Sequence, residues 1–287
     1  LSAHLEKLIT YYQNKEFEKV LNESERLIQK YPKSLKLFSI HGAAAMQLKK
    51  YQKALESYNK VINIDPNYAD GHNNKGLILK EMDLVNESIE SFLLATKIAP
   101  DHFDAYNNVG NVLRQNADFN NAIKNFETAL KINPNCSATY FNLGKTYRDK
   151  GIIDKAISSY EKALELNPNF SLAHNDLGAI FIKLGNLNDA SKHCRKALKI
   201  DPNNAEIVNN LGILFQNQGN LCKAKNQYNK AIDLRPGYSL AHNNLGNVLV
   251  EKGELDEAIC HYSKCLRSKP DHFVSFEACF ALLVQLG

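Results

Sequence analysis

The sequence predicts an all-α fold in which about eight helix-turn-helix units and a partial ninth stack into a solenoid. Two periodic features of the 287 residues carry this prediction. All eight prolines recur every 34 residues, from Pro32 to Pro270, and seven glycines keep the same period, from Gly42 to Gly246. A fixed period of about 20–50 residues is the signature of repeat architectures. Because no unit shows the apolar alternation of a β-strand, a helical repeat is favoured over a propeller.

The first helix of a unit is clearest in residues 137–170. The apolar residues at helical spacing are Tyr140, Leu143, Gly144 and Tyr147. Gly151 follows the last of them and ends the helix, as a glycine does when the backbone must turn out of helical geometry. Glycines fill the same place in the next three units, at Gly185, Gly219 and Gly253.

The second helix of the same unit has its own apolar stripe. Its members are Ile153, Ala156, Ile157, Tyr160, Ala163 and Leu164. Pro168 ends this helix because proline disfavours helical geometry in the residue before it. Gly144 and the two alanines are small enough to let the paired helices approach to the short end of the usual separation of about 8–10 Å. One such pair cannot bury its apolar face alone, so neighbouring units must stack into a continuous core.

The pattern aromatic-x-x-Leu-Gly-x-x-Tyr, then Ala, Ala and Pro, resembles the tetratricopeptide repeat (TPR). The resemblance covers an atypical N-terminal capping repeat at 1–34, seven regular repeats at 35–272 and a first-helix remnant at 273–287. The first repeat departs from the pattern at Leu8, Val20, Ser24 and Leu27. The family implies a right-handed superhelix whose first helices line a concave groove, and a non-catalytic module for protein–protein interaction.

Composition and motifs exclude several other classes of protein. A net charge of +4 is too small for a nucleic-acid binder, and the longest apolar run, Ala278 to Val284, is too short to span a membrane. No signal peptide is visible at the first residues, so we expect a cytoplasmic protein. No phosphate loop, nucleophile elbow or zinc-type spacing of the six cysteines is present, so we expect no enzyme, cofactor or metal. We expect His72, His174, His242, Cys194 and Cys265 to be packing residues, because they occupy core positions of the repeat.

Asparagine recurs in two adjacent rows of the first helix. The first row is Asn74, Asn108, Asn142, Asn210 and Asn244, with Asp176 in the remaining place. The second row precedes it by one residue and comprises Asn73, Asn107, Asn175, Asn209 and Asn243, interrupted by Phe141. Asparagine is a poor interior helix former, because its amide competes for backbone hydrogen bonds. Its repeated placement here therefore requires an explanation.

A carboxamide offers a donor and an acceptor together, which complements the peptide groups of an extended chain. Repeats stacked roughly 9–10 Å apart would match about three extended residues each. The arrangement is similar to the asparagine ladder of the TPR superhelix in O-linked N-acetylglucosamine transferases, which holds extended substrate peptide. Two interpretations remain open: the amides bind a polypeptide, or they bond one another across repeats and only satisfy the inner wall.

Three cations on adjacent repeats, Arg114, Lys145 and Arg148, add a candidate dock for a carboxylate of the ligand. The candidate peptide-binding residues are therefore Asn74, Asn108, Asn142, Asn210, Asn244, Asn107, Asn209, Asn243, Arg114, Lys145 and Arg148. Over repeats two to eight, the predicted groove carries six positive residues, these three among them, and seven negative ones, Asp149 among them. This balance does not suit a polyanion.

The last segment, 273–287, is more apolar than the outer face of a capping helix should be. Its apolar residues are Phe273, Phe276, Phe280, Leu282, Leu283, Val284 and Leu286, with one charge, Glu277. We expect further chain, a docked domain or a subunit to cover this end. Larger proteins that resemble this one carry a glycosyltransferase or sulfotransferase domain after the repeats. The alternatives are therefore a substrate-presenting arm of such a transferase, or a passive scaffold that assembles through its apolar end.

Overall fold

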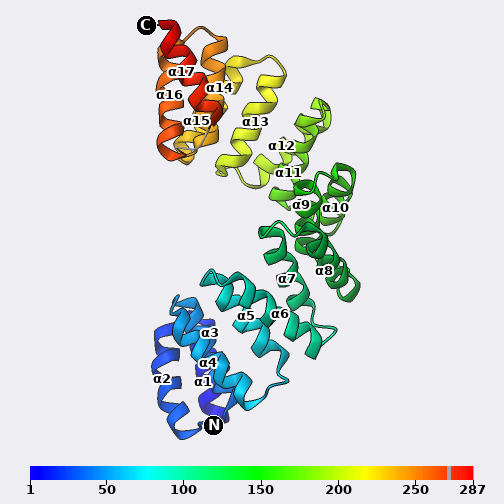
Figure 1. Cartoon of the computed structure of the whole chain (residues 1–287), viewed down its shortest axis with the longest axis vertical. Coiled ribbons are helices and arrows are strands. Elements are labelled where there is room, and N and C mark those ends of the chain that lie inside the picture. Colours follow the sequence, from blue (N-terminus) through cyan, green and yellow to red (C-terminus); the bar gives the residue numbers. More distant parts are fainter. Residues whose placement is uncertain (270–272, 287) are drawn as a thin grey trace. The chain divides into compact units, whose positions relative to one another are not determined.

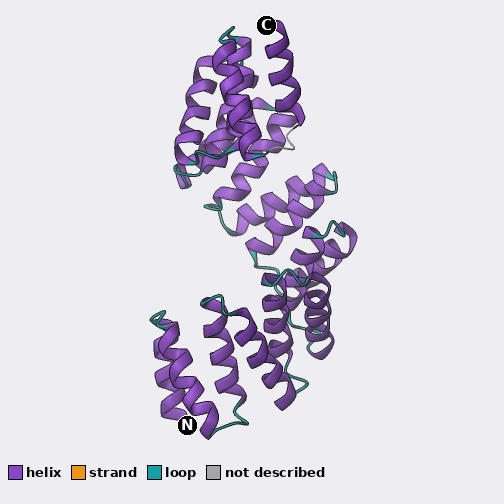
Figure 2. Cartoon of the chain, turned by 60° about the vertical axis from the view of Figure 1, so that its left-hand side comes forward, coloured by secondary structure: helices purple, strands orange, loops and turns teal. Residues whose placement is uncertain are grey.

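A computed structural model describes residues 1–269 and 273–286, and all the regular elements of these residues are α-helices (Figures 1 and 2). Pro270, His272 and Gly287 lie outside the described residues, as do the side chains of Leu283 and Leu286. The predicted all-α fold of eight helix pairs and one further helix is confirmed.

The chain divides into two compact units, residues 1–152 and 153–287. The first unit contains α1 (Ser2–Gln13), α2 (Phe17–Lys30), α3 (Leu35–Gln47), α4 (Tyr51–Ile64), α5 (Ala69–Glu81), α6 (Val85–Ile98), α7 (Phe103–Gln115), α8 (Phe119–Ile132) and α9 (Ser137–Asp149). The second contains α10 (Ile153–Leu166), α11 (Ser171–Lys183), α12 (Leu187–Ile200), α13 (Ala205–Asn217), α14 (Leu221–Leu234), α15 (Ser239–Glu251), α16 (Leu255–Ser268) and α17 (Phe273–Leu286).

Within each unit, consecutive helices pack as hairpins, and several first helices also contact the first helix of the next hairpin (Figure 1). Such first-helix contacts join α5 to α7 in the first unit, and α11 to α13 and α13 to α15 in the second. We call the surface formed by the odd-numbered helices of a unit its first-helix face. This face carries both asparagine rows.

The periodic glycines let an aromatic ring of the second helix lie directly on the first helix. A Cβ added at Gly76 would lie 2.7 Å from the ring of Phe92, and one at Gly246 would lie 2.5 Å from the ring of Tyr262. Both rings are buried. The sequence prediction of a close helix approach is therefore confirmed at these positions, and only glycine fits without moving a buried ring.

The second glycine series ends first helices in left-handed backbone geometry, as predicted. Gly151 and Gly219 have φ values of +85° and +75°. The earlier repeats keep this geometry without glycine, since Lys49 and Ala117 have φ values of 57° and 60°. Backbone shape is thus conserved between repeats where the residue type is not.

The predicted small residues pack at the centre of each hairpin. Ala156 and Ala163 are completely buried, and Val20 occupies the corresponding place in the first repeat. The stretch 1–34 therefore forms a helix pair with its own buried positions despite its departures from the pattern. Among the described residues, no helix is both long and apolar enough to cross a bilayer.

The last helix, α17, covers α16 with one face and exposes the other. Cys279 and Leu282 are buried against the preceding hairpin, so Leu282 does not belong to the exposed apolar surface that the sequence predicts. Phe273, Phe276 and Phe280 remain 69%, 55% and 61% exposed. The predicted apolar surface is therefore present at these phenylalanines.

Candidate functional site

The two asparagine rows differ in depth. We call Asn74, Asn108, Asn142, Asn210 and Asn244 the outer row, and all five are partly exposed on the first-helix face. We call Asn73, Asn107, Asn175, Asn209 and Asn243 the inner row, and all but Asn107 are buried. A ligand on the first-helix face would reach the outer row before the inner one.

Neighbouring repeats are joined by hydrogen bonds from the outer row to the inner row of the preceding repeat. The Nδ2 atoms donate to Oδ1 atoms 35 residues earlier: Asn108 to Asn73 at 2.9 Å, Asn210 to Asn175 at 2.9 Å, and Asn244 to Asn209 at 3.1 Å. Each bond uses one N–H of the outer amide and fixes the plane of that amide. The outer Oδ1 and the second N–H are left for another partner.

Two inner asparagines are satisfied by hydroxyl groups instead. The Thr139 hydroxyl donates to Asn107 Oδ1 at 3.1 Å, and the Ser275 hydroxyl donates to Asn243 Oδ1 at 2.7 Å. Thr139 and Ser275 share a repeat position at which Ala105 stands in another repeat. Sequence reasoning missed these donors, although hydroxyl residues at an alanine position of the core were a visible signal.

Asn74 and Asn142 differ from the rest of the outer row. Within residues 1–269 and 273–286, neither side-chain amide forms a hydrogen bond with the protein. The residue 35 positions before Asn74 is Ser39, whose shorter side chain does not bond it. The buried Ser39 Oγ itself has no hydrogen-bond partner in this part of the chain.

Two of the three cations predicted to dock a ligand carboxylate already hold a carboxylate of the chain. Arg114 Nη1 lies 2.9 Å from Asp149 Oδ2, and Arg148 Nη2 lies 3.0 Å from Asp149 Oδ1. Lys145 Nζ lies 5.5 Å from the ring centroid of Phe141, within the range of a cation–π contact. Asp149 therefore balances one of the two guanidinium charges. Asp149 is one of the acids expected on the groove, and the sequence pattern does not reveal its pairing with these arginines.

The one acid in the outer row has its own partner. Asp176 is buried and accepts a hydrogen bond from the Tyr160 hydroxyl at 3.0 Å. It and Phe141, the interruption of the inner row, are 35 residues apart in sequence, like the bonded asparagine pairs. In the sequence, Phe141 and Asp176 thus stand at the two positions that a bonded asparagine pair occupies in other repeats.

Two histidine pairs in the second unit each join a buried histidine, His174 or His242, to a half-buried one. His174 Nδ1 lies 3.0 Å from His193 Nδ1, and His242 Nδ1 lies 2.9 Å from His261 Nδ1. His242 Nε2 lies 3.0 Å from the Pro236 carbonyl oxygen, which can only accept. His242 therefore donates through Nε2, and its Nδ1 accepts the proton of His261 Nδ1. Burial, with a smaller effect of the facing histidine, lowers the pKa of His193 and of His261 to about 4.

The other reactive residue types are in packing positions. His72, His174, His242, Cys194 and Cys265 are buried, as predicted, and burial raises the pKa of the Cys194 thiol to about 11. In the described residues, no three His, Cys, Asp or Glu side chains are grouped closely enough to hold a metal ion. The described residues thus offer hydrogen-bonding and contact surfaces.

Stacked helical hairpins with a polar first-helix face define an all-α repeat protein, and family models specify which kind. A TPR repeat model matches residues 42–83, 144–185, 178–219 and 217–253. Two tetratricopeptide repeat models match residues 103–136, and residues 69–102 and 240–272. The chain belongs to the tetratricopeptide repeat family. The matched models are all repeat models, and modules of this kind are scaffolds for protein–protein interaction.

Solved structures share the fold at low sequence identity. The chain is similar to the Cut9–Hcn1 hetero-tetramer of the APC/C, with a TM-score of 0.72 and 19% identity over 96% of this chain and 54% of that chain. A tetratricopeptide repeat protein from Parabacteroides merdae gives a TM-score of 0.70 and 16% identity over 91% and 98% of the two chains. YrrB, described as a TPR protein with an unusual peptide-binding site, gives 0.54 and 24% identity over 66% and 97%.

The chain spans about half the length of the Cut9–Hcn1 chain that it matches. No curated protein sequence gives a significant match. Because the identities lie under 25%, these likenesses show the fold.

Proposed function

We propose that the chain binds an extended polypeptide along the first-helix face, with the outer-row amides hydrogen-bonding the ligand backbone. The observation that carries this proposal is that the inner row holds three of the five outer-row amides, those of Asn108, Asn210 and Asn244, in a fixed plane. Such an amide presents one acceptor and one donor, as does each peptide group of an extended strand.

The inner row acts as support in this proposal. Asn209 and Asn243 are 2% and 8% exposed, so a ligand would not reach them directly. Asn209 Oδ1 accepts from Asn244, and Asn107 and Asn243 accept from hydroxyl groups. Fixing an amide before the ligand arrives removes the entropic cost of ordering it during binding.

Specificity would come from the less regular neighbours of the rows. The cluster of Arg114, Arg148 and Asp149 has one surplus positive charge, and Lys145 adds another beside the Phe141 ring. An acidic or aromatic side chain of the ligand would complement this part of the face. The amides would bind backbone of any sequence, and this cluster would select among sequences.

Asn74 and Asn142 provide the sharpest test, because they lack protein partners among the described residues and their loss should not weaken the fold. The full chain would be panned against a random-peptide library, and each binder titrated by calorimetry against wild type and Asn74→Ala/Asn142→Ala. We expect affinity to fall about tenfold or more, since each lost hydrogen bond contributes about 1 kcal/mol, while the unfolding midpoint is unchanged.

The matched control is Asn125→Ala/Asn226→Ala, which removes two amides from the second helices α8 and α14 and should leave affinity unchanged. Asn108→Ala should lower both affinity and stability, because Asn108 also bonds Asn73. Absence of any binder, or an affinity unchanged in both Asn74→Ala/Asn142→Ala and Asn108→Ala, would show that the rows are structural.

A second candidate function rests on α17. Its exposed phenylalanines, two of which stack with ring centroids 6.3 Å apart, would suit a docked domain or subunit. A partner docked on α17 is compatible with both the transferase-arm and the scaffold interpretation. Self-association that depends on concentration and disappears in Phe276→Ser/Phe280→Ser would support assembly through this end, and a monomer at all concentrations would contradict self-assembly.

A further inference from the structure

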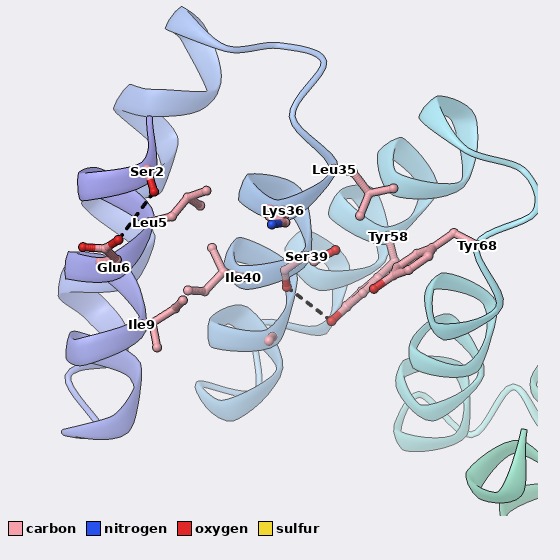
Figure 3. Close-up of a pocket in the computed structure, with 11 residues that line it drawn as sticks. Ser2, Leu5, Glu6, Ile9, Leu35, Lys36, Ser39, Ile40, Tyr58 and Tyr68 are labelled. Atoms are coloured by element: carbon pink, nitrogen blue, oxygen red, sulfur yellow. Dashed lines mark hydrogen bonds between the residues drawn. The ribbon is translucent and has the colours of Figure 1, made fainter.

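An apolar pocket of about 480 Å³ lies at the start of the first-helix face in the first unit (Figure 3). Leu5 and Ile9 of α1 point toward Ile40 of α3, and the rings of Tyr58 and Tyr68 lie on the other side. Its volume falls within the range of about 300–1,000 Å³ usual for ligand pockets. All these elements belong to the first unit.

The position of the pocket in the repeat pattern is informative. Leu5 stands at the inner-row position of the first repeat, and Ile40 stands at the outer-row position of the second. They are 35 residues apart, the spacing that joins Asn73 to Asn108. At this step an apolar pair therefore replaces the hydrogen-bonded amide pair, and the pocket lies where three of the later steps have an amide–amide bond.

The polar groups of the pocket suit a neutral ligand that includes a peptide group. Ser39, which lines the pocket at the inner-row position, has a buried Oγ without a partner in the described part of the chain. Glu6 and Lys36, both exposed, also line it and carry opposite charges, so the pocket has no net charge. An apolar side chain with its adjoining backbone amide would fill the volume and satisfy Ser39.

We propose that this pocket binds one large apolar side chain, of the leucine or phenylalanine class, from the same extended polypeptide. The proposal rests on the proposed function, because the occupant is placed by a backbone that runs along the outer row. The first-helix face runs from the pocket on α1 and α3 to the amide of Asn74 on α5. A polypeptide bound along this face would therefore also reach the pocket, which favours this occupant. The pocket would thus set which residue of a ligand lies at the start of the amide row.

The position of the apolar residue in the ligand follows from the repeat spacing. Asn74 is one repeat beyond the pocket and Asn108 is two repeats beyond it. With about three extended residues per repeat, the apolar residue should lie about three to six residues from the segment held by these amides.

The test uses the full chain and the peptides selected from the random library. Each selected peptide would be compared with a version in which its conserved apolar residue is alanine, against wild type, Ala43→Phe and Ile40→Asn. Ala43→Phe fills the pocket, and Ile40→Asn restores the residue type of the later repeats. Circular dichroism and the unfolding midpoint of each variant would establish that it folds, and the two variants disturb the pocket in different ways.

We expect wild type to prefer the apolar peptide over its alanine version by about tenfold or more, as burial of one large side chain implies. In both pocket variants this preference should fall below about twofold, whereas Asn74→Ala/Asn142→Ala should weaken both peptides equally. Selected peptides without a common apolar residue, or a preference that survives both pocket variants, would overturn the pocket while leaving the amide proposal intact. Absence of any binder would overturn both.

Discussion

Ala117 occupies a backbone conformation that suits glycine better. Its φ of 60° lies at the turn that follows α7, where Gly151, Gly185, Gly219 and Gly253 stand in later repeats. A β-carbon in this region is crowded against the backbone, at a cost of about 1–2 kcal/mol. The hairpin thus holds Ala117 in a turn conformation that alanine does not favour.

Ala117→Gly should therefore stabilise the protein by about 1 kcal/mol, since the relief of crowding exceeds the extra chain entropy of glycine in the unfolded state. The free energy of unfolding from urea titrations would measure it. The matched variant is Gly219→Ala, for which no atom lies within 4 Å of the added carbon, so that its loss of about 1 kcal/mol reports φ alone. A destabilising Ala117→Gly would contradict this explanation.

At the residue scale, the sequence predicts well the positions at which one residue type is required. Gly76 and Gly246 were predicted to lie at a close helix approach, and Cys194 to be a packing residue, and their environments agree. The pairing of Asp149 with Arg114 was not predicted, because charged side chains on a repeat surface have several partners within reach.

At the element scale, the histidine pairs make the stability of the second unit depend on pH. The pKa of His261 is lowered to about 4 by burial, and His242, Lys264, Glu257 and Lys225 are the charged or titratable groups around it. An unfolded histidine has a pKa of about 6.5. Between these values the unfolded chain binds a proton that the folded chain does not, so stability falls as the pH is lowered from about 6.5 toward 4.

His193→Gln/His261→Gln should reduce this acid sensitivity, because His193 has the same lowered pKa. We expect the difference in unfolding free energy between pH 7 and pH 4.5 to shrink by on the order of 1–2 kcal/mol per histidine, allowing for partial exposure. Glutamine is compatible with this position, since Gln227 occupies it in another repeat. The exposed His4→Gln is the control, and an equal change there would mean that the pairs are not responsible.

The asparagine rows show what periodicity can and cannot predict at this scale. It places both rows on the first helix, because residues at one repeat position share a face. It does not reveal that Asn210 Nδ2 donates to Asn175 Oδ1, since that bond depends on how closely the neighbouring helices approach. Nor does it separate Asn142, free of such a bond in the described chain, from Asn108.

At the scale of the whole molecule, repeat proteins transmit instability mainly to neighbouring repeats. Gly110→Ala would place a Cβ 2.7 Å from the buried ring of Phe126 and should destabilise α7 and α8 by about 1–3 kcal/mol. Hydrogen exchange with mass spectrometry should show the largest acceleration in α7 and α8, a smaller one in α5 and α6, and the smallest in α15 and α16.

Gly237→Ala is the matched control for that experiment. The nearest atom to its added carbon is Ser268 Oγ at 3.9 Å, so exchange should be unchanged throughout. A uniform acceleration along the chain in Gly110→Ala would instead show a single cooperative unit.

The whole fold is the level at which the sequence is most informative. In the sequence a proline follows each of the eight second helices, and glycines end the first helices of four later repeats, so the period predicts the eight pairs and one further helix. The pocket at Leu5 and Ile40 could not be predicted in the same way, because a departure from a pattern does not reveal whether the space it leaves is filled.

The bonds between asparagine rows also make repeats interchangeable. Each bond joins an outer residue of one repeat to an inner residue of the repeat before it, so the three bonded junctions share the same chemistry. Excision of residues 205–238 would bring Asn244 to 35 residues after Asn175, with donor and acceptor both intact. A gene encoding this chain could therefore gain or lose copies of such a repeat by recombination, changing the length of its binding face without leaving a mismatched junction.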